Sequence, residues 1–212
     1  MRKFMLGIVI IFGQMASAEE VVIAALGDSL TQGYGLAPAE GFVPQLQGWL
    51  DAREAQVRLI NAGVSGDTTA GGLARVGWTL TPEVDAMIVT LGGNDMLRGL
   101  DPAEARRNIG GILQAAETAQ IEVLLIGMQA PGNYGSDYKS AFDALYPELA
   151  AQHESLYVEN FFAALIEAAG SSDPSALRAY FQPDGIHPNA KGVALIVKEI
   201  GPQVLALAAA AR

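Results

Sequence analysis

The sequence contains no cysteine, only two histidines and few basic residues. Without cysteine the chain can form neither a disulfide nor a lipoprotein anchor, and two histidines leave few ligands for zinc. The 13 lysines and arginines are outnumbered by 23 aspartates and glutamates, so the net charge is −10. This charge disfavours nucleic acids and anionic membrane surfaces as partners. We therefore expect no nucleic-acid partner and no metal or other cofactor, with a carboxylate-only magnesium site left open.

Long apolar runs are also scarce, and the first lies at the N-terminus. Arg2 and Lys3 precede the apolar run 4–12, which is too short to span a bilayer, and residues 16–18 (Ala-Ser-Ala) form a small-x-small cleavage site. This order predicts a cleavable signal peptide over residues 1–18, and the alternative is a buried N-terminal strand or helix. We expect residues 19–212 to form a single domain that is periplasmic or secreted and has no stable membrane anchor.

Short apolar runs alternate with longer segments of helical periodicity along the rest of the chain. This alternation is typical of a parallel sheet that is covered by helices on both faces. It predicts an α/β fold with a five-stranded parallel sheet. The predicted strands are 21–26, 57–61, 86–91, 123–126 and 156–158, and the predicted helices are 42–51, 68–77, 102–119, 138–152, 161–168 and 190–210.

Polar, glycine-rich segments follow the first three predicted strands. Ser29 follows the first strand, residues 63–67 follow the second, and residues 92–95 follow the third. Because ligands bind outside the carboxyl ends of parallel strands, we expect these three segments to lie together at one edge of the sheet. Each segment alone would be interpreted as an ordinary turn. Their coincidence is what predicts a functional site.

Ser29 and His187 are the residue types of an activated serine nucleophile. A serine hydroxyl needs a base to take its proton, and a histidine base works best when a carboxylate holds its tautomer. Asp184 lies three residues before His187 and can reach the second ring nitrogen if this segment forms a tight turn. His153 lies at a predicted helix end, where we expect a solvated or capping residue. We therefore predict Ser29, Asp184 and His187 as the catalytic residues.

Acyl transfer also requires hydrogen-bond donors for the negative charge of the tetrahedral intermediate. Gly66 lies just before a predicted helix and offers a backbone N–H without a side chain to obstruct it. Asn94 can supply a side-chain amide, and Ser29 its own N–H. We predict these three residues as an oxyanion hole. Three aspartates of the same segments are expected to be structural: Asp28, Asp67 and Asp95.

Four sequence blocks resemble the ordered blocks of the SGNH (GDSL) hydrolases. They are Gly27-Asp28-Ser29-Leu30, Gly66 within 61–68, Asn94 within 92–95, and Asp184-Gly185-Ile186-His187-Pro188. The chain is most similar to the group of periplasmic arylesterases, acyl-CoA thioesterases I and lysophospholipases, including a loop like residues 131–135. The Gly-x-Ser-x-Gly elbow of other hydrolases is absent, because Thr31 stands where its second glycine would be.

This resemblance implies a flavodoxin-like three-layer α/β/α sandwich and no metal. It also implies a role for each predicted site residue. Ser29 would be the nucleophile, His187 the base and Asp184 its orienting acid. Ser29, Gly66 and Asn94 would form the oxyanion hole.

Apolar side chains near these blocks predict where an acyl group would bind. Our candidate substrate-binding residues are Met96, Leu97, Tyr134 and Ile186, whereas Phe142, Phe161 and Phe162 are predicted to be core. We expect a monomeric serine hydrolase that cleaves carboxylic esters or thioesters, such as aryl esters, acyl thioesters or lysophospholipids. A carbohydrate O-deacetylase of cell-envelope sugars is the alternative enzyme. A non-catalytic periplasmic binding protein is the alternative from another class.

Overall fold

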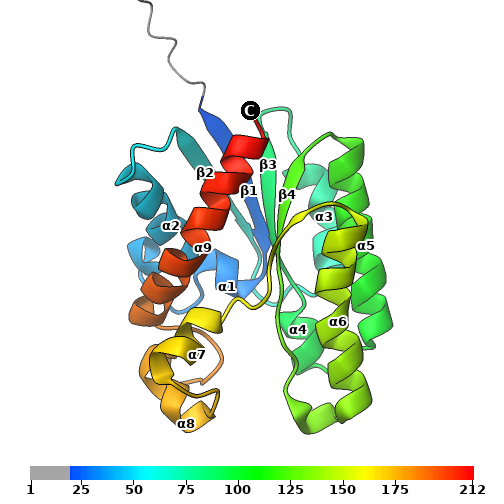
Figure 1. Cartoon of the computed structure of the whole chain (residues 1–212), viewed down its shortest axis with the longest axis vertical. Helices are drawn as coiled ribbons and strands as arrows, with labels where there is room; N and C mark the ends of the chain where they lie inside the picture. Colours follow the sequence, from blue (N-terminus) through cyan, green and yellow to red (C-terminus); the bar gives the residue numbers. More distant parts are fainter. Residues whose placement is uncertain (1–19) are drawn as a thin grey trace, which may run out of the picture.

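The computed structural model describes residues 20–212, and the predicted signal peptide lies outside the described residues (Figure 1). Five parallel strands form one sheet in the order β2-β1-β3-β4-β5. Their bounds are β1 (Val21–Gly27), β2 (Val57–Gly63), β3 (Ala86–Thr90), β4 (Glu122–Ile126) and β5 (Leu156–Val158). The predicted five-stranded parallel sheet is confirmed. Every residue of β1 and β3 is buried, because both strands are central and covered on both faces.

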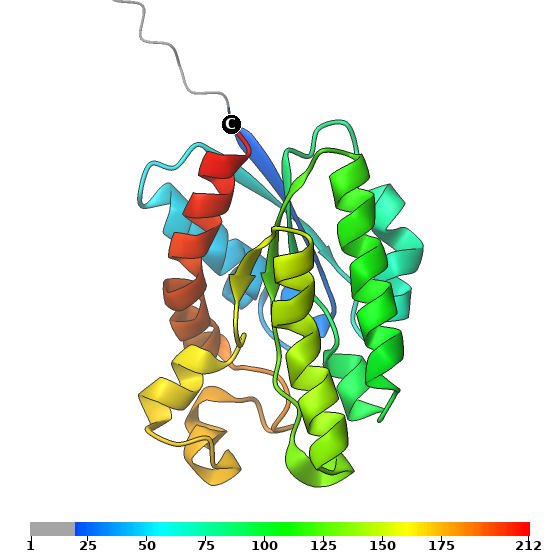
Figure 2. The same ribbon diagram turned by 45° about the vertical axis from the view of Figure 1, so that its right-hand side comes forward.

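Helices cover the two faces of the sheet, as the two views in Figures 1 and 2 show. On one face α2 (Phe42–Asp51) and α9 (Ala190–Ala210) pack together. On the other face lie α3 (Thr69–Thr79), α5 (Pro102–Thr118) and α6 (Ser136–Gln152). Each face has its own apolar core, with Ile23, Leu46 and Ile196 fully buried in the first and Met87, Ile109 and Phe142 in the second. The predicted three-layer sandwich is confirmed.

Two single-turn helices lie where the sequence predicted loops. They are α1 (Ser29–Gln32), directly after β1, and α4 (Gly93–Leu97), after β3. One turn is too short to show an apolar period, so periodicity could not reveal either helix. The remaining elements are α7 (Ala163–Ala169), α8 (Pro174–Leu177) and three 3-10 turns, η1 (Pro38–Glu40), η2 (Gly132–Tyr134) and η3 (Arg178–Tyr180).

Helix α9 is long and apolar enough to cross a membrane by length and composition. In this structure it is a core helix, because one side of it packs against α2 and the sheet. Val193, Ile196, Ile200 and Leu207 are almost fully buried along that side. Its apolar composition therefore has a structural explanation within the fold.

Candidate active site

Ser29 is the first residue of α1 and lies at the carboxyl end of the central strand β1. The preceding residue, Asp28, caps this helix, because its Oδ1 accepts a hydrogen bond of 3.0 Å from the Leu30 N–H. Asp28 therefore ties down the turn, as predicted. Its side chain is 1% exposed, and this burial raises the pKa of the Asp28 carboxyl to about 6.

His187 and Asp184 belong to one tight turn before α9. The Asp184 Oδ1 accepts hydrogen bonds from the backbone N–H groups of Ile186 (2.9 Å) and His187 (3.0 Å), which makes this an Asx-type turn. The turn places Asp184 Oδ2 2.7 Å from His187 Nδ1, and His187 Nε2 lies 2.9 Å from Ser29 Oγ. The structure thus brings all three predicted residues into one hydrogen-bonded chain.

The hydrogen bonds around Asp184 also set its charge. Partial burial alone raises the pKa of this carboxyl, but hydrogen bonds from the His187 ring and from the two backbone N–H groups lower it to about 2. Asp184 is therefore ionised at neutral pH. An ionised carboxylate at Nδ1 favours the tautomer in which Nε2 carries the free lone pair that faces Ser29.

The segment after β2 forms a type II turn. The Asp67 N–H donates to the Val64 carbonyl at 3.1 Å, and Gly66 has φ of 85°, a left-handed value that this turn requires of its third residue. Within residues 20–212 the N–H groups of Gly66 and Ser29 donate no hydrogen bond to the protein. Both are therefore free to receive an anion.

Asn94 connects this turn to the serine segment. Its Nδ2 lies 2.9 Å from the Asp67 carbonyl oxygen and 3.3 Å from Asp28 Oδ2. The second contact is long for a hydrogen bond to a carboxylate. The three residues predicted to form the oxyanion hole, Ser29, Gly66 and Asn94, are thus neighbours around Asp28 and Asp67.

An apolar pocket of about 230 Å³ opens beside Ser29 and Asn94. We call it the inner pocket. Met96, Leu97 and Ile186, which were predicted to contact substrate, line its wall together with Met128, Phe162 and Phe181. Tyr134 is not among its lining residues, and its hydroxyl instead donates to the Leu97 carbonyl at 3.3 Å.

The interpretation of Phe162 as a core residue was wrong in part. The residue is half-buried and packs against the core, but it also lines the inner pocket. Phe142 and Phe161, by contrast, are fully buried, as predicted.

Residues 25–195 match the model of the GDSL-like lipase/acylhydrolase family. This match covers most of the chain and contains Ser29, Gly66, Asn94 and His187. The chain belongs to this family. Its membership agrees with the order in which the four blocks occur and with the parallel sheet that places them at one edge.

Characterised family members are similar over nearly the full chain. Esterase TesA of Pseudomonas aeruginosa is 36% identical over 91% of this chain and 91% of its own length. Thioesterase 1/protease 1/lysophospholipase L1 of Escherichia coli K12 is 33% identical over 86% of this chain and 81% of its own. The crystal structure of AlinE4, an SGNH-hydrolase family esterase, superposes with a TM-score of 0.71 at 42% identity and covers 90% of this chain and 98% of AlinE4.

Three residues that support the site were missed by the sequence analysis. The ring of Tyr34 lies 4.7 Å from the His187 ring, centroid to centroid. Arg98 Nη2 donates to the Gly66 carbonyl at 2.8 Å, and Arg75 pairs with Asp67 at 2.6 Å. The sequence offered one signal for two of them: Tyr34 lies shortly after Ser29 in the chain, and Arg98 lies shortly after Asn94. Neither could be assigned a partner without the fold.

The remaining aspartates of these blocks are structural, as predicted. Asp67 holds Arg75, and buried Asp95 accepts hydrogen bonds from the Thr69 N–H and hydroxyl at 2.8 and 2.6 Å. These contacts anchor the start of α3 to α4.

The second histidine has a different environment. His153 follows the last residue of α6, but its side chain is 7% exposed and its Nδ1 lies 2.7 Å from Glu117 Oε1. The predicted capping position is therefore found, whereas the side chain is paired rather than solvated. In the part of the chain that the structure describes, no group of three histidine, aspartate or glutamate side chains is placed to hold a metal ion.

Proposed function

We propose that the protein is a serine esterase or thioesterase of the SGNH type that works through an acyl-enzyme on Ser29. The observation that carries this proposal is the chain of contacts Ser29 Oγ to His187 Nε2 (2.9 Å) and His187 Nδ1 to Asp184 Oδ2 (2.7 Å). These distances lie within hydrogen-bond reach for a nucleophile, its base and the group that orients the base.

The first half of the reaction acylates the serine. Ser29 Oγ attacks the carbonyl carbon while His187 Nε2 takes the hydroxyl proton, and the Asp184 carboxylate stabilises the imidazolium that results. When the tetrahedral intermediate collapses, the bond from carbon to the leaving oxygen or sulfur breaks. His187 gives its proton to that leaving atom. The product alcohol or thiol departs, and the acyl group remains on Ser29.

The second half returns the enzyme to its starting state. A water molecule attacks the acyl carbon as His187 takes one of its protons, and a second tetrahedral intermediate forms. Its collapse breaks the bond to Ser29 Oγ, which regains its proton from His187. A carboxylic acid is released.

Both tetrahedral intermediates carry a negatively charged oxygen. In our proposal it accepts hydrogen bonds from the N–H groups of Ser29 and Gly66 and from Asn94 Nδ2. The Asn94 hydrogen that makes the long contact of 3.3 Å with Asp28 is the one best able to turn to the oxyanion. The other hydrogen is donated to the Asp67 carbonyl, which lies 2.9 Å from Asn94 Nδ2, and would hold the amide in place.

The names of the relatives support a small-molecule acyl substrate. They include an esterase, a thioesterase and a lysophospholipase, and the apolar inner pocket beside Ser29 fits an acyl group. We propose aryl esters, acyl thioesters and lysophospholipids as the substrate classes. Export after cleavage near Ala18 and a monomeric state are part of the same proposal, and the export rests on the sequence of residues 1–18.

A fluorophosphonate probe tests the nucleophile directly. The wild-type protein should become labelled, Ser29→Ala should not, and Ser140→Ala, on the exposed side of α6, should label like the wild type. A panel of aryl esters, acyl-CoAs, lysophospholipids and acetylated sugars then tests the substrate class. An unlabelled wild-type protein would support a binding protein instead, and activity confined to acetylated sugars would support an O-deacetylase.

A further inference from the structure

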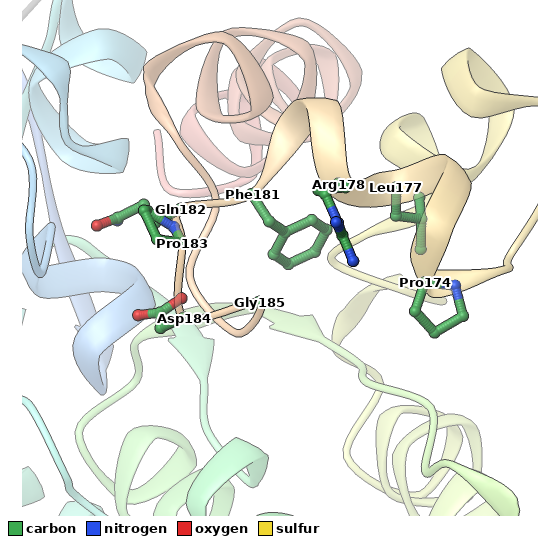
Figure 3. Close-up of a pocket in the computed structure, with 8 residues that line it drawn as sticks. All are labelled: Pro174, Leu177, Arg178, Phe181, Gln182, Pro183, Asp184 and Gly185. Atoms are coloured by element: carbon green, nitrogen blue, oxygen red, sulfur yellow. The ribbon is translucent and has the colours of Figure 1, made fainter.

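A second and larger cavity lies beside Phe181, and Asp184 of the active site is one of its lining residues. Its volume is about 750 Å³, and we call it the outer cavity. It lies between the segment α8–η3 and the turn that carries Asp184, as the close-up shows (Figure 3). Four of its eight lining residues have apolar side chains, namely Pro174, Leu177, Phe181 and Pro183, and the other four are Arg178, Gln182, Asp184 and Gly185.

The outer cavity and the inner pocket share part of their walls. Phe181 and Gly185 line both of them. The Phe181 ring also packs against Phe162 of the inner pocket at 5.6 Å, and its backbone pairs with Pro188, next to His187. Gly185 has no side chain, and a Cβ added there would meet open space. The boundary between the two cavities is therefore one aromatic ring beside an unobstructed glycine.

The geometry of the site decides which part of a substrate points into the inner pocket. The leaving group must lie at His187 Nε2, because His187 has to give it a proton. The acyl chain then lies on the other side of the reacting carbonyl, in the apolar inner pocket lined by Met128, Phe162 and Phe181. At about 230 Å³ this pocket is smaller than the ~300–1,000 Å³ common for ligand sites, so it suits only a short chain.

We propose that the outer cavity binds the distal part of a longer acyl chain, which passes Phe181 beside Gly185. The substrate class would then be esters or thioesters of medium-length to long acyl chains. This inference rests on the proposed function, because it assigns a binding site to the acyl part of the same substrate. The proximal part of the acyl chain would then lie on one side of Phe181, in the inner pocket, and its distal part on the other side, in the outer cavity.

A charge placed in the outer cavity tests this proposal. Leu177 lines the outer cavity and not the inner pocket, so Leu177→Asp puts a carboxylate on the distal wall. Ser175→Asp is the matched control, since it adds the same charge to the same helix α8 at an exposed position outside the lining. Activity is measured as kcat/KM on p-nitrophenyl butanoate and decanoate, both below their micelle concentrations. Asp184 lines the same cavity, and the rate on the butanoate reports any effect of the new charge on the catalytic turn.

Each methylene that is fully buried in the transition state contributes up to roughly fourfold in kcat/KM. Leu177→Asp should therefore lower kcat/KM on the decanoate by about tenfold relative to kcat/KM on the butanoate. Ser175→Asp should leave both substrates unchanged. Pro174→Trp, which fills the cavity from its exposed rim, is a second variant in case Leu177→Asp does not fold.

The ratio of decanoate to butanoate activity decides the outcome. If folded variants keep the wild-type ratio, the distal chain does not bind in the outer cavity and the proposal is overturned. Failure of the proposed function itself would look different, because the wild-type protein would then hydrolyse neither ester.

Discussion

Burial of Asp28 gives the protein an unusual dependence of stability on pH. The carboxyl has a pKa of about 6 in the folded state, against 3.8 when unfolded, because burial disfavours its charged form. The folded protein therefore holds the Asp28 proton more tightly than the unfolded chain does. The contribution to stability is fully present below pH 3.8 and is lost as the pH rises to about 6.

The size of this effect follows from the difference between the two pKa values. A difference of about two units corresponds to a total loss of about 3 kcal/mol, since each unit corresponds to about 1.4 kcal/mol. About 2 kcal/mol of that loss should fall between pH 4 and pH 7. The side chain is 1% exposed, so solvent does not screen this effect.

The substitution Asp28→Asn isolates this contribution. Asparagine keeps an oxygen that can accept the hydrogen bond from the Leu30 N–H, but it does not titrate. The free energy of unfolding is measured by urea denaturation of both proteins at several values between pH 4 and pH 7. The wild type should lose about 2 kcal/mol relative to the variant over this range.

The prediction concerns how the difference in unfolding free energy between the two proteins changes with pH. The size of that difference at any one pH is not predicted, because the substitution also shifts stability by an amount that does not depend on pH. Other titrating groups cancel in the comparison as long as they behave alike in both proteins. If the two stability profiles run parallel from pH 4 to pH 7, Asp28 is ionised in the folded state at pH 4 and the argument from burial is refuted.

Three further substitutions test the proposed chemistry. Asp184→Asn should lower kcat roughly ten-thousandfold at pH 7 by giving His187 the wrong tautomer, and titration with an active-site probe should show whether the folded site persists. Asn94→Ala should lower kcat about a hundredfold with little change in KM, and an equal loss in ground-state binding would contradict an oxyanion role. Arg98→Ala removes the 2.8 Å hydrogen bond to the Gly66 carbonyl and should lower kcat about tenfold. Arg98→Lys should recover part of that loss. Unchanged kinetics in Arg98→Ala would show that the position of Gly66 does not depend on this hydrogen bond.

Much of the fold could be predicted because its signals are local. The central strands are continuous apolar runs, since helices bury them on both faces, and this is visible in the sequence. Helices α2 and α9 have the predicted bounds. Helices α1 and α4 were missed because each is a single turn that depends on a cap or a glycine rather than on apolar periodicity.

The contacts of the active site also differ in whether a local sequence pattern predicts them. The contact of Asp184 with His187 spans three residues and is made by an Asx-type turn, which the sequence indicates directly. The contact of Ser29 with His187 joins residues 158 positions apart, and it could be expected only because parallel strands bring their carboxyl ends to one edge. No local pattern and no general rule for parallel sheets predicts the contact of Tyr34 with His187 or that of Arg98 with Gly66.

The sequence by itself therefore determined the α/β class, the residues at the carboxyl edge of the sheet and the turn that joins Asp184 to His187, because each depends on local patterns or on a general rule for parallel sheets. Only the tertiary structure decided that β1 lies between β2 and β3, that Phe162 lines the inner pocket, and that Phe181 separates this pocket from the outer cavity. These features depend on how side chains distant in the chain pack against one another, and no local pattern specifies that packing.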